Sequence, residues 1–183
     1  MTKPQLSTPL VADTGPRIYL ACLAAYNSGR LHGTWVEPDK GEDHIWDALR
    51  AMLAKSPVLG AEEWAIHAYE GFEGAGVSES ASFGSVCALA GFITEHGELG
   101  AKVLEHFGND LEDAEAEFQA YAGCYSSAAE FAEQLHENIG TEIPISLQHY
   151  IDWQSLARDM ELNGDIIIFE MGFETVHIFW SRW

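Results

Sequence analysis

The sequence predicts an α+β protein in which a small sheet with one helix, a helical unit and a mixed unit of sheet and helices follow one another. Apolar residues make up 47% and aromatic residues 11% of the chain, as is typical of a protein with a core. Apolar residues alternate near both ends, as in strands, and recur every three or four positions in the middle, as in amphipathic helices. The 183 residues suffice for one ordinary domain or for two or three very small ones.

Residues 1–16 are predicted to be a flexible N-terminal tail. They contain three prolines and few large apolar residues, and they lack the basic start and the apolar run of a secretory signal. No later segment approaches the roughly 18 consecutive apolar residues of a membrane span. We therefore expect a soluble protein.

Residues 17–77 are predicted to form an N-terminal domain of one sheet and one helix. Two alternating segments, "RIYLACLAAY" (residues 17–26) and "TWVEP" (residues 34–38), flank the turn residues "NSGRLHG" and indicate a hairpin. "EEWAIHAYEGF" indicates a further strand. Between them, Asp43 is expected to cap a helix, whose apolar stripe consists of Ile45, Trp46, Leu49, Met52 and Leu53.

Residues 78–121 are predicted to form a helical middle domain. Ser82 is expected to begin a helix that ends at Gly97, and a second helix is expected to end at Gly108. A third helix is expected to follow the second. Apolar residues at helical spacing indicate both of them: Leu99, Val103, Leu104 and Phe107 in the second helix, and Leu111, Ala114, Phe118 and Tyr121 in the third.

Residues 122–183 are predicted to form a C-terminal mixed α/β domain. "AGCYS" indicates a short strand, and Ser127 with Glu130 has the pattern of a capping box at the start of a helix. Ser146 is expected to begin another helix that includes Met160. The closing segment "GDIIIFEMGFETVHIFWSRW" predicts a β-hairpin that turns near Gly172.

Negative charge is concentrated in the middle of the chain. The formal net charge is −20, and between Ser56 and Ala157 there are 18 acidic residues and one base, Lys102. Such a field repels nucleic acid and anionic membranes and attracts basic surfaces. The same composition also fits an acidic surface that only keeps the protein soluble. Adaptation to high salt is a further alternative. It would spread the negative charge over the whole chain, whereas the first 55 residues hold six acids and six bases.

The segment "LEHFGNDLEDAEAEFQAY", residues 104–121, carries six carboxylates and no Lys or Arg. On a helical wheel, the apolar stripe around Leu111 is narrow and carboxylates occupy most of the remaining circumference. Like charges at i+3 or i+4 destabilise a helix by roughly 0.2–0.5 kcal/mol per pair. The carboxylates on the wheel are Glu112, Asp113, Glu115 and Glu117, and a further row on the next helix consists of Glu130, Glu133 and Glu137.

The spacing of these carboxylates is close to that of phosphates along a nucleic-acid strand. Because duplex DNA carries one charge per about 1.7 Å of axis, the net charge of −20 corresponds to roughly 34 Å of duplex. The pattern therefore supports either a protein that imitates DNA or a more general acidic interaction domain.

The sequence gives little support to an enzyme, because catalytic and metal-binding motifs are not evident in it. Cys22, Cys87 and Cys124 are odd in number and far apart, which argues against a disulfide framework or a zinc site and favours the reducing cytoplasm. Counting from Asp110, an EF-hand loop fails, because its sixth position is a glutamate instead of glycine. The chain lacks the common nucleophile, phosphate-binding and metalloprotease motifs, while paired carboxylates of the glycosidase type remain possible.

A di-iron site is also unfavourable. It would need two Glu-x-x-His pairs on helices together with two further glutamates. Glu133 with His136 forms one such pair. Glu174 with His177 lies in sequence typical of a strand, where positions i and i+3 face opposite sides.

Several long segments give the chain its resemblance to a known family: "RIYLACLAAYNSGRLHGTWVEP", "EEWAIHAYEGFEGAGVSESASF", "VLEHFGNDLEDAEAEFQAYAGCYSSAAEFAEQL" and "VHIFW". From Arg17 to Trp183 the sequence resembles the ArdA antirestriction family. The resemblance implies an elongated chain of three small domains and a two-fold dimer. It also implies a non-enzymatic DNA mimic that inhibits type I restriction-modification enzymes and shields mobile DNA entering a bacterial host.

The resemblance further implies the partners and site residues. The partner would be a type I enzyme, with its methyltransferase core and specificity subunit, and no cofactor, metal, membrane or direct nucleic-acid binding is expected. The antirestriction motif and dimer contact would include Leu99, Val103, Leu104, Phe107, Asp110, Leu111, Ala114 and Phe118. The acidic surface is predicted to comprise Glu62, Glu63, Glu70, Glu73, Glu79, Glu95, Glu98, Glu105, Asp110, Glu112, Asp113, Glu115, Glu117, Glu130, Glu133 and Glu137.

Overall fold

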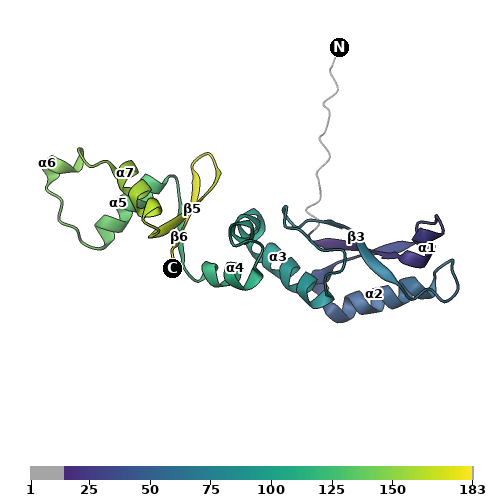
Figure 1. Ribbon diagram of the computed structural model, residues 1–183. Coiled ribbons are helices and arrows are strands. Elements are labelled where there is room, and N and C mark those ends of the chain that lie inside the picture. The colour runs from purple at the N-terminus through teal and green to yellow at the C-terminus, as the bar shows by residue number, and fades with distance from the viewer. Residues whose placement is uncertain (1–14, 183) are drawn as a thin grey trace, which may run out of the picture. The chain divides into compact units, whose positions relative to one another are not determined.

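The computed structural model describes residues 15–182, and the chain divides into two compact units after Ala101 (Figure 1). Each unit contains a three-stranded antiparallel sheet with helices, which confirms the predicted α+β class. Most of the predicted tail, residues 1–14, lies outside the described residues. The division after Ala101 falls within the predicted middle domain, and the arrangement in three domains stays a prediction.

The sheet of the first unit has the strand order β2-β1-β3. It consists of β1 (Arg17–Cys22), β2 (Gly33–Val36) and β3 (Trp64–Glu70), and the hairpin of β1 with β2 is confirmed. The first strand is shorter than predicted, because Leu23–Asn27 forms the helix α1. Its leucine and two alanines are better suited to a helix than to an exposed strand end.

The helix α2 (Glu42–Ala54) packs on this sheet after a short 3₁₀ turn, η1 (Pro38–Lys40). Ile45, Leu49 and Met52 are buried with the inner side chains of the strands. The prediction that Asp43 caps this helix is wrong. Gly41 occupies the capping position at φ 95°, which an aspartate rarely adopts, and Asp43 lies in the first turn.

The helix α3 (Phe83–His106) begins after Ser82, whose Oγ accepts a hydrogen bond from the Ser85 amide at 3.1 Å. Gly97 interrupts it with φ 56° and ψ −142°, so the predicted helix end at this glycine is confirmed as a kink. The start of α3 is fixed to the first unit by Phe83, whose ring stacks on Trp64 with centroids 4.5 Å apart.

The second unit contains the sheet β4-β6-β5. The predicted closing hairpin is confirmed, and its two-residue turn is Phe173 and Glu174. One face packs on two helices around Phe131, Ile166 and Ile178. The elements in chain order are α4 (Leu111–Phe118), β4 (Tyr121–Tyr125), α5 (Ala128–Asn138), α6 (Ile145–Gln148), α7 (Trp153–Leu162), β5 (Ile166–Gly172) and β6 (Thr175–Trp180).

The single helix expected from Ser146 to Met160 is wrong, because the structure has two. The short helix α6 ends at Gln148, and α7 begins after Asp152. The Asp152 carboxylate accepts hydrogen bonds from the Ser155 amide at 3.0 Å and the Ser155 hydroxyl at 2.7 Å. Aspartate is a preferred N-cap, so the chain restarts its helix there.

None of the helices within residues 15–182 has both the length and the apolar character that crossing a membrane requires.

Candidate functional site

The helix α4 carries the densest group of predicted site residues, and Asp110 determines where this helix begins. Asp110 has an extended backbone, and its carboxylate accepts a hydrogen bond from the Asp113 amide at 3.1 Å. Such a cap satisfies one of the free amides at the helix start. The Asp110 carboxylate therefore has a structural role in addition to its negative charge.

Three carboxylates of α4 face solvent. Glu112, Asp113 and Glu115 are exposed, whereas Ala114 is completely buried. Glu112 and Asp113 lie in the first turn, where negative charge interacts favourably with the helix dipole by about 0.3–1 kcal/mol. This interaction offsets the mutual repulsion of the carboxylates, so a short helix with this composition is stable.

Glu117 does not belong to the acidic surface, and its prediction as a surface residue is wrong. Its side chain is only 1% exposed, and its Oε1 has no hydrogen-bond partner among the described residues. Burial raises the pKa of Glu117, and electrostatic interactions with Arg182 and His106 act in the opposite direction. The sequence could have indicated the burial of Glu117, because it follows the apolar Ala114 by three positions and residues at i and i+3 share a helix face.

The helix α5 presents two exposed carboxylates, Glu133 and Glu137, one turn apart. Glu130 is turned toward the start of the helix, where its carboxylate accepts hydrogen bonds from the Ser126 amide and hydroxyl, both at 2.6 Å. Hydrogen bonding to the Ser126 hydroxyl is the main cause that lowers the pKa of Glu130. Ser127 caps the helix as predicted, because its hydroxyl accepts a hydrogen bond from the Glu130 amide at 3.1 Å. In a full capping box the Glu130 carboxylate would accept from the Ser127 amide, but here it accepts from the Ser126 amide instead.

The remaining predicted surface carboxylates are all exposed. Two of them interact within the first unit: Glu70 pairs with Arg17, and Glu79 lies 3.7 Å from the His67 ring nitrogen. The others are Glu62, Glu63, Glu73, Glu95, Glu98 and Glu105.

The predicted motif and dimer-contact residues fall into different environments. Val103, Leu104 and Ala114 are 2% exposed or less, so they belong to the core of the chain. Asp110 is exposed. The half-buried members of the motif are Leu99, Phe107, Leu111 and Phe118.

The structure gives the carboxylates no metal-binding geometry among residues 15–182. No group of three or more His, Cys, Asp or Glu side chains in this range could hold a metal ion. His136 places its Nδ1 3.2 Å from the Thr141 hydroxyl, and its ring lies 5.7 Å from that of Trp153. Glu174 lies in the turn between β5 and β6 instead of on a helix.

The described residues thus form two small α+β units, with solvent-facing carboxylates on the short helices α4 and α5. Comparison with protein families gives a match to the antirestriction protein family (ArdA) over residues 18–175. The chain therefore belongs to the ArdA family of antirestriction proteins. No curated protein matches the sequence.

Proposed function

We propose that the chain imitates the charge of duplex DNA and competitively occupies the DNA-binding groove of type I restriction-modification enzymes. The observation that carries this proposal is the group of solvent-facing carboxylates around α4, formed by Glu112, Asp113 and Glu115. The second unit, from Lys102 onward, contains sixteen acidic and three basic residues, a net charge of −13. Membership of the antirestriction family supplies the class of target.

The proposed mechanism is an exchange of phosphates for carboxylates. Lys and Arg residues that line a DNA groove normally neutralise phosphates, and the exposed carboxylates of α4 and α5 would meet the same cations. The acidic helices require no catalytic group for this role, because occupation of the groove is itself the inhibition. Complementary charge accelerates encounter as well as strengthening the complex, and both effects weaken as salt rises.

We further propose a two-fold homodimer that acts in the bacterial cytoplasm and shields incoming mobile DNA. An isologous contact presents the same acidic surface twice. A net charge of −40 for a dimer, twice that of the chain, corresponds to roughly 68 Å of duplex at the charge density of DNA.

A second candidate function is a binding module for a different basic protein, such as a component of the nucleoid. The same exposed carboxylates support it, because long-range attraction between opposite charges does not by itself select the partner. This alternative predicts salt-sensitive binding to that basic protein and no effect on restriction.

Displacement of DNA distinguishes the two functions. The full chain is titrated into a type I methyltransferase, with its specificity subunit, bound to a fluorescent duplex that contains the recognition site. We expect stoichiometric displacement of the duplex at low salt. A duplex that stays bound at a large molar excess of the protein would contradict the proposed function.

A further inference from the structure

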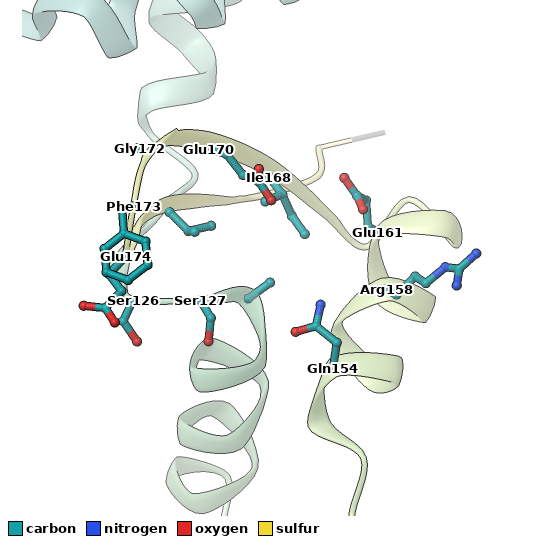
Figure 2. Close-up of a pocket in the computed structure, with 12 residues that line it drawn as sticks. Ser126, Ser127, Gln154, Arg158, Glu161, Ile168, Glu170, Gly172, Phe173 and Glu174 are labelled. Atoms are coloured by element: carbon teal, nitrogen blue, oxygen red, sulfur yellow. The ribbon is translucent and has the colours of Figure 1, made fainter.

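A groove of about 590 Å³ lies in the second unit, at the end of the sheet where β5 turns into β6. Figure 2 shows it between this hairpin, the first turn of α5 and the helix α7. Ile168 of β5 is directed into its centre, and Gln154 of α7 lies opposite the start of α5. All of these elements belong to one compact unit, so the groove is a property of that unit.

The groove combines an apolar floor with an acidic rim. Ala128, Ile168 and Val176 supply apolar side chains from three elements. Glu161, Glu170 and Glu174 supply carboxylates, and all three are exposed. A ligand that fits this combination has an extended apolar part and a positive end.

The rim carboxylates are available for an external cation. Within residues 102–182, Glu161, Glu170 and Glu174 form no ion pair with a described basic side chain; the ion pairs of the described residues lie in the first unit. Arg158 also lines the groove, but Figure 2 shows its guanidinium extending away from Ile168. Lys102 is engaged by the backbone carbonyl of Glu170, at 2.9 Å.

An anion is a poor occupant of the same groove, although a helix begins beside it. The free amides at a helix start attract anions, but here the Glu130 carboxylate already accepts from the Ser126 amide and hydroxyl. The Ser127 hydroxyl also accepts from the Glu130 amide. The groove is therefore complementary to positive charge.

Phe173 provides an apolar contact at the edge of the groove. Its side chain is 90% exposed at the tip of the β5–β6 hairpin. Phe173 lines the groove together with Glu174 and Ser126, which Figure 2 labels on the same side of it. Exposed aromatic residues adjacent to a pocket are typical anchors of protein interfaces.

We propose that this groove docks a long basic side chain, Lys or Arg, of the protein that the chain inhibits. The methylene stem of the lysine or arginine lies on Ile168 and Val176, the cationic end reaches Glu161 and Glu170, and Phe173 packs on the neighbouring surface of the partner. Long basic side chains bury their apolar stems while their charges stay paired or hydrated. This inference rests on the proposed function and adds a shaped contact to an otherwise diffuse electrostatic surface.

The test compares two pairs of substitutions that remove the same charge. Glu161→Gln with Glu170→Gln neutralises the rim, and Glu142→Gln with Asp165→Asn neutralises two other exposed carboxylates of the same unit. In the displacement assay with the type I methyltransferase, the rim pair is expected to weaken inhibition about tenfold and the control pair less than threefold. Phe173→Ser is expected to weaken inhibition about fivefold, and Leu59→Ser, at a fully exposed position of the first unit, is the matched apolar control.

A second measurement observes the groove without the enzyme. The peptide acetyl-Gly-Arg-Gly-amide is titrated into the full chain, and methyl NMR signals of Ile168 and Val176 are expected to shift in the unmodified chain but not in the rim pair. Absence of these shifts, or equal weakening of inhibition by the rim and control pairs, would overturn the proposed role of the groove but not the proposed function. Failure of the unmodified chain to displace DNA would instead overturn the proposed function.

Discussion

The two units of the chain share an α+β architecture but use their charged residues differently. The first unit, up to Ala101, has thirteen acidic and six basic residues, whereas the second has sixteen and three. In the first unit, carboxylates pair with Arg17, Lys40 and Arg50. Among residues 102–182, no carboxylate forms such a pair with a described basic side chain.

Under the proposed function, this difference separates the residues that stabilise the fold from those that meet the partner. Surface ion pairs contribute at most about 1 kcal/mol each to stability, so the second unit loses little by leaving its carboxylates unpaired. It relies on an apolar core around Phe131 and Ile178 and on capped helices instead. Under the proposed function, its unpaired carboxylates stay available for another protein.

The largest effect is expected from neutralising the exposed carboxylates of the second unit. A variant with Glu112→Gln, Asp113→Asn, Glu115→Gln, Glu133→Gln and Glu137→Gln is expected to need at least about tenfold more protein to displace DNA from a type I methyltransferase. Each lost contact with a basic groove costs a few tenths of a kcal/mol or more. Glu112→Gln alone is expected to have little effect, because the remaining charges act together.

The matched control removes five exposed charges from the first unit: Asp39→Asn, Asp43→Asn, Glu62→Gln, Glu63→Gln and Glu73→Gln. We expect this variant to retain more of its inhibition than the variant of the second unit. Equal losses in the two variants would contradict the assignment of the main contact to the second unit, and would indicate attraction by net charge alone.

An intermediate effect on stability is expected at Glu117. Replacement by Gln is expected to raise the free energy of unfolding at pH 7 by about 1 kcal/mol, because the substitution removes a charge whose burial is costly. Urea denaturation at several pH values checks this. Inhibition at pH 7 should stay unchanged, because Glu117 is buried away from the proposed contact surface.

The pH dependence follows from the direction of the shift. The pKa of Glu117 is raised in the folded state above its ordinary value of 4.5, so the folded protein binds the proton more tightly. The resulting penalty is absent below pH 4.5 and grows as pH rises toward the folded pKa. The gain from Glu117→Gln should therefore shrink at pH 4, and a gain independent of pH would contradict a buried ionisable group.

The smallest effect on stability is expected from Asp110→Asn, because charge and capping can be separated at this position. Asp110→Asn keeps an N-cap acceptor and is expected to change stability by less than about 0.5 kcal/mol, whereas Asp110→Ala is expected to cost about 1 kcal/mol. Thermal unfolding measures both. If the two substitutions destabilise the protein equally, the hydrogen bond to the Asp113 amide does not support α4.

Sequence periodicity was sufficient for most elements of the fold. The alternation around β1 and β6, the capping residues Ser82 and Ser127, and the glycine at position 97 each placed an element correctly. The helix starts predicted at Asp43 and Ser146 were wrong. The backbone conformation of Gly41 determines where α2 begins, and the carboxylate of Asp152 determines where α7 begins. The local sequence does not show which of several nearby capping residues begins a helix.

The candidate site was predicted less completely than the fold. Exposure of Glu112, Glu115 and Glu133 follows from their places on helical wheels, but the burial of Glu117 depends on packing of α4 that the wheel does not contain. The groove beside Phe173 joins residues from α5, α7 and the β5–β6 hairpin. No sequence spacing brings these residues together, because only the folded sheet places them side by side.

The salt dependence of association tests the central claim most directly. Binding of the full chain to a type I methyltransferase is measured by fluorescence anisotropy from about 50 to 200 mM salt, a range over which protein–DNA affinity falls steeply. We predict a steep linear decrease of log affinity with log salt concentration, and a shallower slope for the variant neutralised on α4 and α5. An affinity independent of salt, or identical slopes for the two proteins, would contradict the exchange of phosphates for carboxylates.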